Sequence, residues 1–433
     1  MLDAALPVEW GWGRLGDFFE VTRKPRGLQL NEHEATVFIP MEAIAQDGAY
    51  SPRYETRAVA ELTSGTYFEK GDLLVAKITP SFENGKQALV ADCPNDFGFA
   101  TTEVIPLRPK EAHYSLRLLF FYLLHPDVRS YIAERMEGST ARQRVPEPVL
   151  LDLPFPRVSA REQAAMADVL AGIVTARLLQ RRAERISIRL KNSVMDSVFA
   201  FGLRNEERKE SEIGPIPKSW SLRPLGSLGK VGSGTTPNRT DPRYWNEGTV
   251  PWVTSGRMYE REITGSAEKV TTEAIRDARL PMLTPGAILM AIVGQGKTLG
   301  HCAILRVAAT VSRHVGFVQP DGNAISSEYL RGFLESRYEL LRQLAAGNGS
   351  TRAALTGAIL RSVTVPVPPT LEAQNEIVAV LDAVDHRIDL HRQRAALLDE
   401  LFKTTLHELI TGQIRVADLD TSAIADGSLV EMA

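Results

Sequence analysis

The stretch from Ala291 to Thr298 (AIVGQGKT) is the part of this chain that most resembles a nucleotide-binding motif. It satisfies a relaxed phosphate-loop pattern, with alanine in place of the first glycine. Such a loop binds because backbone amides and the N-terminus of a following helix surround the phosphates. The residues after Thr298 (LGHCAIL) are typical of a turn and a strand instead. We therefore interpret Lys297 as a loop cation, and an ATPase stays an alternative.

Two further segments have some features of a methyltransferase. Asp241-Pro-Arg-Tyr244 is similar to the Asp/Asn-Pro-Pro-Tyr tetrad of amino-methyltransferases, but arginine stands where the second proline should be. Val231-Gly-Ser-Gly234 is rich in glycine, yet Thr-Thr-Pro follows it and not the start of a helix. These departures count against a methyltransferase site, which we keep as a second enzymatic alternative.

Metal and thiol chemistry find little support in the sequence. Cys93 and Cys302 have no metal-ligand spacing, and we expect two reduced thiols in a cytoplasmic protein. His386 and His391 are five residues apart, which is not the i, i+4 spacing of a helical metal pair. The N-terminus lacks the features of a signal peptide, and no apolar run is long enough to span a bilayer.

Charge is distributed unevenly along the chain. The 433 residues carry a net charge of −3 and are 44% hydrophobic, which is ordinary for a globular protein of two to four domains. Residues 218–257 contain six basic and two acidic side chains. Nucleic-acid binding needs only local positive potential, so the net charge does not exclude it.

The chain repeats itself after about 210 residues. Pro7, Trp10, Leu15 and Gly16 recur with the same spacing at Pro217, Trp220, Leu225 and Gly226. Further blocks recur in the same order at offsets of 211 to 215, namely Gly71–Ala76 with Gly286–Ala291, Gly85, Ala88 and Val90 with Gly300, Ala303 and Leu305, Gly138–Thr140 with Gly349–Thr351, Pro154-x-Pro156 with Pro366-x-Pro368, and Gln163 and Leu170 with Gln374 and Leu381. The period exceeds that of solenoid repeats, so it indicates a duplicated domain.

Each half begins with a mixed α and β segment. Leu73–Ile78 and Ala88–Val90 are typical strands in the first half, as are Ala287–Val293 and Cys302–Leu305 in the second. A helix follows in each half, predicted over Leu116–Met136 and Ser327–Leu344.

Each half then ends in a long helical segment, over 159–199 and 370–411. Ser159 and Thr370 are candidate N-caps. The second segment has an apolar seam with alternating steps of four and three, at Ile377, Leu381, Val384, Ile388, His391, Ala395, Leu398, Phe402, Thr405 and Leu409. The best line in the first is Leu179, Ala183, Ile186, Leu190, Val194 and Val198.

Helices of about 40 residues are roughly 60 Å long. An apolar seam on such a helix needs a partner, and the equal lengths favour an antiparallel pair within the chain. A coiled coil that only dimerises the protein stays an alternative. The charged stretch from Leu203 to Pro215 is typical of an exposed linker, and the polar residues after Ile414 are typical of a frayed tail.

With these features together, the chain resembles the specificity (S) subunit of type I restriction–modification systems over about residues 5–415. The blocks that carry the resemblance are Ile216–Trp220 with Leu225-Gly226, Gly232–Pro237, Val250–Gly256, Gly349–Arg352, and Val365–Pro369 with Glu372-x-Gln374 and Ile377-x-x-x-Leu381. The first half departs from this pattern. Its opening contains Trp10-Gly-Trp12-Gly, Phe18-Phe19 and Arg23-Lys-Pro-Arg26 and lacks the Gly-rich loop, and its proline block lacks the double proline.

The resemblance implies an α+β fold with two globular α/β target-recognition domains, separated by two long antiparallel coiled-coil helices in a pseudo-twofold internal repeat. The expected divisions are recognition domains at 1–152 and 216–364, helical regions at 153–204 and 365–415, a linker at 205–215 and a polar tail at 416–433. A non-catalytic subunit is expected, and a coiled-coil scaffold that does not bind DNA is the alternative outside enzymology.

The resemblance also implies that each recognition domain reads one half of a split sequence in double-stranded DNA. Arginine pairs bidentately with guanine and lysine suits phosphate. The candidate DNA-binding residues are Arg23, Lys24, Arg26, Lys77, Asn84, Lys86, Arg142 and Arg144 in the first half, and Asn238, Arg239, Arg243, Ser255, Arg257, Lys297, Arg313 and Arg352 in the second.

The implied partners are two methyltransferase (M) subunits, which dock on the helical spacer, and restriction (R) subunits. S-adenosylmethionine and ATP are expected on those partners, and no cofactor, metal or membrane contact is expected for this chain. The candidate spacer and docking residues are Leu170, Ile173, Ile186, Leu190, Ile377, Leu381, Val384, Ile388, Leu398 and Phe402.

Overall fold

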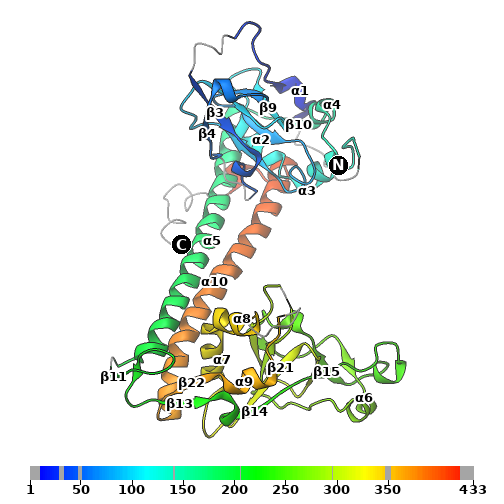
Figure 1. Ribbon diagram of the computed structural model, residues 1–433. Coiled ribbons are helices and arrows are strands. Elements are labelled where there is room, and N and C mark those ends of the chain that lie inside the picture. The colour runs from blue at the N-terminus through cyan, green and yellow to red at the C-terminus, as the bar shows by residue number, and fades with distance from the viewer. Residues whose placement is uncertain are drawn as a thin grey trace. The chain divides into compact units, whose positions relative to one another are not determined.

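The computed structural model describes residues 10–28, 34–46, 51–139, 142–204, 206–294, 296–346 and 353–419. The chain forms two compact units, each of which we treat by itself (Figure 1). The first unit consists of Met1–Glu184 and Leu390–Ala433, and the second of Arg185–Asp389. Each unit therefore contains one globular part and a segment of each long helix.

Two four-stranded sheets form the globular part of the first unit. One has the strand order β2(Phe19–Val21), β9(Val104–Pro109), β6(Leu73–Ala76), β7(Gln87–Leu89), and the other has the order β4(Glu55–Ala58), β3(Ala35–Ile39), β8(Phe97–Ala100), β5(Thr66–Glu69). All neighbouring strands are antiparallel except β3 and β8. All four residues of β6 are buried, which agrees with the continuous apolar run in the sequence.

A five-stranded sheet forms the core of the globular part in the second unit. Its order is β14(Gly229–Ser233), β21(Val315–Pro320), β18(Ile288–Ala291), β19(Cys302–Leu305), β16(Glu262–Ile263), and a smaller sheet has the order β17(Lys269–Val270), β15(Val250–Val253), β20(Thr310–Val311). Helix α6 (Thr272–Asp277) packs near the smaller sheet, because its Ala274 shares an apolar cluster with Trp252 and Val270. The strands predicted over 287–293 and 302–305 correspond to β18 and β19.

The predicted helix in each globular part is two shorter helices. The first is divided into α2 (Leu116–Tyr122) and α3 (Pro126–Ala133), because Pro126 has no amide hydrogen and disfavours helical backbone at His125. The second is divided into α7 (Ser327–Ser336) and α8 (Tyr338–Ala346) at Arg337. The prediction of one continuous helix was therefore wrong in both halves.

A pair of antiparallel strands closes each globular part at its base. These are β1(Gly11–Arg14) with β10(Pro154–Arg157), and β13(Ser221–Pro224) with β22(Thr364–Val367). Within them lie α1 (Leu15–Phe18) and α4 (Glu147–Leu151) in the first unit and α9 (Gly357–Ser362) in the second. We call residues 15–153 the first head and residues 225–363 the second head.

The strand pairs correct one detail of the repeat. Gly11 faces Arg157 and Ser221 faces Val367, so the two closing pairs are equivalent at an offset of 210. The sequence match of Pro154 with Pro366 was therefore two residues out of register, and Pro156 is the counterpart of Pro366. The repeated Trp10 and Trp220 are both buried, which explains why the sequence keeps them.

The long helices are α5 (Ala160–Phe201) and α10 (Leu371–Ile410), within two residues of the predicted bounds. The hydroxyls of Ser159 and Thr370 accept hydrogen bonds from the amides of Glu162 at 3.3 Å and Ala373 at 3.2 Å. Both predicted N-caps are thus confirmed, because each satisfies an amide that the helix leaves without a partner.

Ion pairs connect the two helices within each unit. In the first unit Arg177 pairs with Asp399 at 2.8 Å, and Glu162 at the start of α5 pairs with Arg415 beyond the end of α10 at 2.5 Å. In the second unit Lys191 pairs with Asp385 at 2.7 Å, and Arg204 after α5 pairs with Glu376 at 2.8 Å. Because residue numbers rise along α5 as they fall along α10, the pairing is antiparallel, as predicted.

The seam of α10 largely follows the prediction, whereas that of α5 does not. On α10 seven of the ten predicted seam residues are buried; Val384, Leu398 and Thr405 are half-buried. On α5 the predicted Ile186 and Leu190 are exposed, each by 48%. The buried face of α5 includes the predicted Val198, but it otherwise contains Ile173, Arg177, Gln180, Ser187, Lys191 and Met195.

Polar residues fill the buried face of α5 because α10 offers them partners. Gln180 contacts the imidazole of His391 at 2.8 Å, and Arg177 and Lys191 meet the carboxylates named above. An apolar pattern could not reveal this face.

The segment between the halves is partly ordered by pairing. Strand β11 (Arg208–Lys209) lies antiparallel to β12 (Ile216–Pro217), and the ammonium group of Lys209 donates to the carbonyl of Lys218 at 3.0 Å. The predicted linker is therefore exposed but includes a short strand. Short 3-10 helices complete the fold at Met41–Ala43, Val59–Glu61, Leu225–Ser227, Pro242–Tyr244, Ser255–Arg257 and Val416–Asp418. Within the described residues, no helix has the length and apolarity to cross a membrane.

Candidate nucleic-acid interface

Three segments of the first head meet at the end of the buried strand β6. The amide of Lys77 donates to the carbonyl of Glu103 at 2.9 Å, and the amide of Val145 donates to the carbonyl of Lys77 at 2.8 Å. We call the residues 77–79, 101–103 and 142–145 the first loop cluster. It brings together Lys77, Arg142 and Arg144, which the sequence proposed separately as DNA-binding residues.

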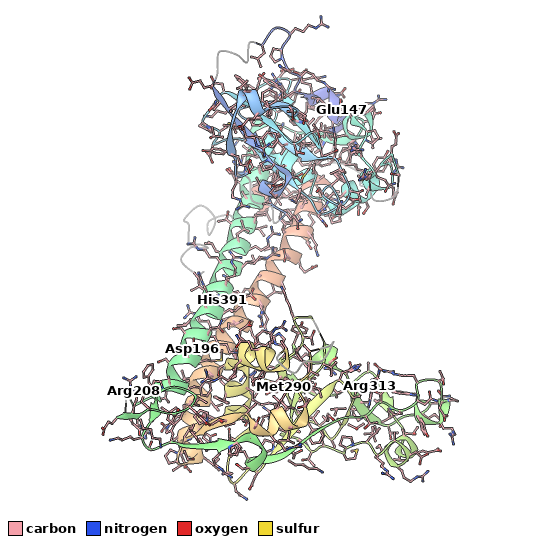
Figure 2. All side chains as sticks on the ribbon, viewed as in Figure 1. Glu147, Asp196, Arg208, Met290, Arg313 and His391 are labelled. Carbon is pink, nitrogen blue, oxygen red and sulfur yellow. The ribbon has the colours of Figure 1, made fainter. Side chains whose placement is uncertain are left out.

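The second head has the equivalent arrangement at the end of β18. The amide of Ile292 donates to the carbonyl of His314 at 3.0 Å, and the amide of Leu355 donates to the carbonyl of Ile292 at 2.8 Å. We call the residues 292–294, 312–314 and 353–355 the second loop cluster. Arg313 belongs to this cluster and is exposed (Figure 2).

The Gly-rich loop of the second head lies against this cluster. The amide of Thr235 donates to the carbonyl of Val311 at 3.2 Å, and the hydroxyl of Thr236 accepts from the amide of Arg313 at 3.4 Å. A Cβ atom at Gly234 would overlap the carbonyl oxygen of Val311, so only glycine allows this approach. The glycines therefore serve packing, and residues 231–233 belong to strand β14 and not to a cofactor loop.

Arg239 is held in place on two tryptophan rings. Its guanidinium carbon lies 4.4 Å from the ring centroid of Trp245 and 4.5 Å from that of Trp252, and the side chain pairs with Glu268. The indole of Trp245 donates to the carbonyl of Asn238 at 2.9 Å, which fixes the loop that carries both candidates. Half of the Arg239 side chain stays exposed, so its planar fork is positioned and accessible.

The segment with the phosphate-loop pattern has a different environment from that of a nucleotide site. Residues 296–299 form a turn that leads into β19, and Lys297 is exposed. Helix α8 fixes this turn, because the hydroxyl of Tyr338 and the guanidinium of Arg342 donate to the carbonyls of Lys297 at 2.6 Å and Gly296 at 2.8 Å. In the described residues 296–305 the motif leads into strand β19 and not into a helix, so the helix N-terminus that a phosphate loop requires does not follow it directly.

Aromatic rings surround the same turn. Tyr259 is 58% exposed, and its hydroxyl lies 2.9 Å from that of Thr298. The ring of His301 lies between those of Tyr259 and Tyr338, with both centroid distances at 4.6 Å. Burial lowers the pKa of His301 from its ordinary value near 6.5 and so favours the neutral imidazole. Exposed rings beside basic residues suit the stacking of bases.

Carboxylates accompany most of the predicted arginines. Arg144 makes two hydrogen bonds to Glu103, at 2.6 and 2.9 Å. These bonds hold the pKa of the Glu103 carboxyl below its ordinary value. Arg243 pairs with Asp241 at 2.7 Å and lowers the pKa of that carboxyl in the same way. Arg23 pairs with Glu147, and Arg257 pairs with Glu260.

These ion pairs have one consequence for DNA binding and one for the net charge of the chain. Exposed ion pairs contribute little to stability, so a phosphate can replace the carboxylate with small loss. Paired arginines also account for a net charge near zero in a chain with basic loops.

The Asp241-Pro-Arg-Tyr244 segment is a turn in which Asp241 caps the 3-10 helix by accepting from the amide of Arg243 at 3.1 Å.

The other candidate residues differ in how available they are. Within the described residues, seven of the basic candidates take part in no ion pair, namely Lys24, Arg26, Lys77, Lys86, Arg142, Lys297 and Arg313. Asn84 and Asn238 are exposed and Ser255 is half-buried, while the ammonium group of Lys86 donates to the carbonyl of Met41 at 2.7 Å. Arg352 lies outside the described residues.

Sequence reasoning missed the aromatic and histidine neighbours of these residues. Trp245, Tyr259, His301 and His314 all lie at or beside the loops that carry the basic candidates. A signal was present, since Arg243-Tyr-Trp245 and Arg257-Met-Tyr259 place rings within two residues of predicted arginines.

The comparisons with known proteins agree on one family. The model of the type I restriction modification DNA specificity domain matches residues 7–186 and again 217–400. The chain is 29% identical over 206 residues to the type I restriction enzyme MjaIX specificity subunit of Methanocaldococcus jannaschii, which covers 46% of each chain. It is 22% identical over 429 residues to the putative type I restriction enzyme MjaX specificity subunit of the same organism, which covers 95% of each.

Solved structures share the fold. One, from work on complex assembly and conformational transition of the type I R-M system, has a TM-score of 0.62 at 19% identity and covers 95% of this chain and 100% of that one. The S subunit of a type I restriction-modification system from M. genitalium has a TM-score of 0.56 at 14% identity, covering 95% and 98%.

The chain therefore belongs to the type I restriction–modification DNA specificity family, with two copies of the domain. This confirms the resemblance seen in the sequence, the α+β fold and the internal repeat. Specificity subunits of type I systems are non-catalytic, so the expected class of protein is also confirmed. The ATPase, methyltransferase and scaffold alternatives are not favoured.

Proposed function

We propose that this chain reads a split sequence in double-stranded DNA, with one half-site for each head. The observation that carries the proposal is the repetition of the loop cluster. Equivalent backbone hydrogen bonds, Lys77 to Glu103 and Ile292 to His314, form the same scaffold in each head, while the side chains on it differ. Two similar scaffolds with different side chains are suited to two different half-sites.

The side chains around each cluster fit the grooves of DNA. Arg313 and Lys77 are basic and form no ion pair among the described residues, and Arg239 is oriented by its tryptophans. Guanine presents two acceptors in the major groove, which a fixed arginine fork can bind together. The half-sites and the individual contacts stay predictions, as do the domain limits at 152, 216 and 364.

A footprint of the chain together with its methyltransferase partner tests the proposal. We expect two protected patches of DNA with an unprotected or weakly protected gap of fixed length. Variants Arg313→Ala and Lys77→Ala should each weaken one patch and leave the other in place. A single continuous patch, or loss of both patches in either variant, would contradict the assignment of one half-site to each head.

We infer that the long helices also carry the docking surface for the methyltransferase subunits. Ile186 and Leu190 on α5 are each 48% exposed, and Leu397 and Leu401 on α10 are 70% and 49% exposed. The two pairs are equivalent at an offset of 211, the same offset that relates Gln163 to Gln374. A chain that presents one apolar pair twice is suited to two copies of one partner.

Burial excludes most of the docking residues that the sequence predicted. Six of the ten are buried and are not accessible to a partner, namely Leu170, Ile173, Ile377, Leu381, Ile388 and Phe402. Val384 and Leu398 are half-buried. Ile186 and Leu190 are accessible, and the sequence did not propose their counterparts Leu397 and Leu401.

The remaining assignments belong to the complex. We propose that a restriction subunit joins the assembly, that S-adenosylmethionine and ATP bind to the partner subunits, and that the complex acts in the cytoplasm. We further propose that the length of the paired helices sets the gap between the two half-sites. Half-sites on one face of DNA repeat about every 34 Å, and helices of about 40 residues reach that scale.

A further inference from the structure

The two heads are anchored to the long helices by the same hydrogen bonds. The side-chain oxygen of Gln163, in the first turn of α5, accepts from the amide of Ser115 at 2.8 Å. The side-chain oxygen of Gln374, in the first turn of α10, accepts from the amide of Ser326 at 2.8 Å. Both serines also cap the first helix of their head, α2 or α7. These anchors would accept either head in either unit.

A buried ionic network distinguishes the second unit. Lys191 of α5 contacts Asp385 of α10 at 2.7 Å and Glu335 of α7 at 2.6 Å, and the side chains of Lys191 and Asp385 are each 10% exposed. Arg331 of α7 pairs with Glu335 at 3.0 Å and approaches Asp385 at 3.5 Å. Arg261 of the same head reaches Asp385 at 3.4 Å. We call Lys191 and Asp385 the ionic seat.

The equivalent positions in the first unit are apolar. At the offset of 211 that relates Gln163 to Gln374, the seat residues Lys191 and Asp385 correspond to Phe402 and Val174. The head residues Arg331 and Glu335 correspond to Phe120 and Leu124. Phe120, Val174 and Phe402 are buried in one apolar cluster, against which Leu124 packs. We call Val174 and Phe402 the apolar seat.

Each seat matches its own head and not the other. The second head on an apolar seat would bury the guanidinium of Arg331 without the carboxylate of Asp385. The first head on an ionic seat would cover Lys191 and Asp385 with phenylalanine and leucine and would supply neither Glu335 nor Arg261. Buried charges are costly when partners are removed, so both mismatches are penalised. Discrimination between similar partners commonly depends on such penalties.

We propose that the ionic seat selects which head docks in the second unit. The shared anchors hold either head, and the seat rejects the wrong one. The ionic seat would thereby keep each head, and the half-site that it reads, on its own segment of the helix pair. It would also disfavour docking of a first head from another copy of this chain. Selection of a head by the ionic seat is a separate property from DNA recognition, and its test requires no DNA.

Four full-length chains test the proposal. Two carry the native second head, on the native seat or on a seat made apolar by Lys191→Phe and Asp385→Val. Two carry residues 15–153 in place of 225–363, again on each seat. The closing strands β13 and β22 stay in all four. Hydrogen exchange of the amides in α10 residues 371–389 reports how firmly each head is docked, because a loosened head exposes this helix.

The expected result is a crossover. With the native head, the apolar seat should speed exchange in this segment by about a hundredfold, since Arg331 loses a buried partner. With the exchanged head, the apolar seat should slow exchange by at least about tenfold relative to the ionic seat. An equal effect of the seat on both heads would overturn the proposal. Unchanged exchange in the native head on the apolar seat would overturn it as well, even if the exchanged chains fail to fold.

Discussion

At the scale of single residues, the two heads present positive charge in two forms. Some basic side chains are held by carboxylates or rings, such as Arg239, and others extend from the loops and pair with no carboxylate in the described part of the chain, such as Lys297. A fixed arginine fork can discriminate between bases, whereas a mobile ammonium group senses phosphate charge. The two forms therefore predict different binding phenotypes.

Replacement of Arg239 should relax recognition at one base pair. We expect Arg239→Ala to lose about 1–3 kcal/mol of specific binding, and to lose it mainly for the preferred base at one position. Arg239→Lys should behave almost like alanine, because lysine keeps the charge but loses the planar fork. Competition binding against a panel of single-base variants measures this, with Arg204→Ala as the control, since Arg204 is exposed and lies outside both heads. Equal weakening for every sequence would contradict the prediction.

Replacement of Lys297 should weaken all sequences alike. A phosphate contact releases counterions, so Lys297→Ala should reduce the slope of log affinity against log salt by about 1. Lys297→Arg should preserve the slope. A titration of binding between low and moderate salt measures the effect. An unchanged slope would remove Lys297 from the interface.

The carboxyl group of Asp72 should give the first unit a distinctive pH dependence. Burial raises the pKa of Asp72 to about 6, although the side chain accepts a hydrogen bond from the amide of Glu69 at 2.8 Å. The folded state therefore binds a proton more tightly than the unfolded state, whose value is 3.8. The resulting stabilisation is complete below pH 3.8 and is lost as the pH rises through about 6.

The Asp72→Asn variant isolates this effect. From pH 7 to pH 5 we expect the native chain to gain about 1–2 kcal/mol of unfolding free energy relative to Asp72→Asn. Denaturant unfolding at the two pH values measures the difference. If the difference in unfolding free energy between the two proteins is the same at both pH values, or changes in favour of Asp72→Asn at pH 5, the pKa of Asp72 is not raised.

At the scale of elements, the two long helices differ in the way they bury their seams. The seam of α10 is mostly apolar, and the sequence pattern found it. The buried face of α5 includes Arg177, Gln180 and Lys191, whose partners lie on α10. The apolar line on α5 is therefore left partly outside, where Ile186 and Leu190 are accessible.

The same substitution at two sites of α10 separates packing from docking. Leu381→Asp places a charge among buried side chains of the second unit and should cost about 3 kcal/mol or more of stability. Leu397 is 70% exposed in the native chain, so Leu397→Asp should change stability by at most about 0.5 kcal/mol. Thermal unfolding measures both.

Leu397→Asp should nevertheless weaken capture of the methyltransferase partner. Size-exclusion chromatography of the mixed subunits checks this, and Ile186→Asp should produce the same loss at the equivalent site. If a chain that carries both Leu397→Asp and Ile186→Asp still binds two partner copies fully, these exposed pairs are not the docking surface.

At the scale of the whole molecule, the duplication predicts a defined gap in the DNA target. Insertion of one heptad into both helices, after Glu184 and after Asp389, adds about 10 Å to the pair. The tolerated gap between half-sites should then increase by about three base pairs, because each base pair rises 3.4 Å, or ~34 Å per turn. Binding to duplexes with graded gaps measures the change. Seven residues added within 205–215 should leave the gap as it was.

The sequence by itself determined the duplication, the two long helices with their caps, and the family. These follow from local patterns, because spacing and periodicity survive without knowledge of contacts. Strands β6 and β19 were also predictable, since buried strands are continuous apolar runs. The break before Pro126 could have been predicted from the proline itself.

Only the tertiary structure decided which polar residues are buried and which basic residues are available. Lys191 and Asp385 look like ordinary surface charges in the sequence, yet they are buried because residues more than a hundred positions apart meet around them. In the same way, Arg144 is paired because Glu103 lies on a neighbouring turn. Partner identity depends on contacts between distant segments, and no local pattern contains that information.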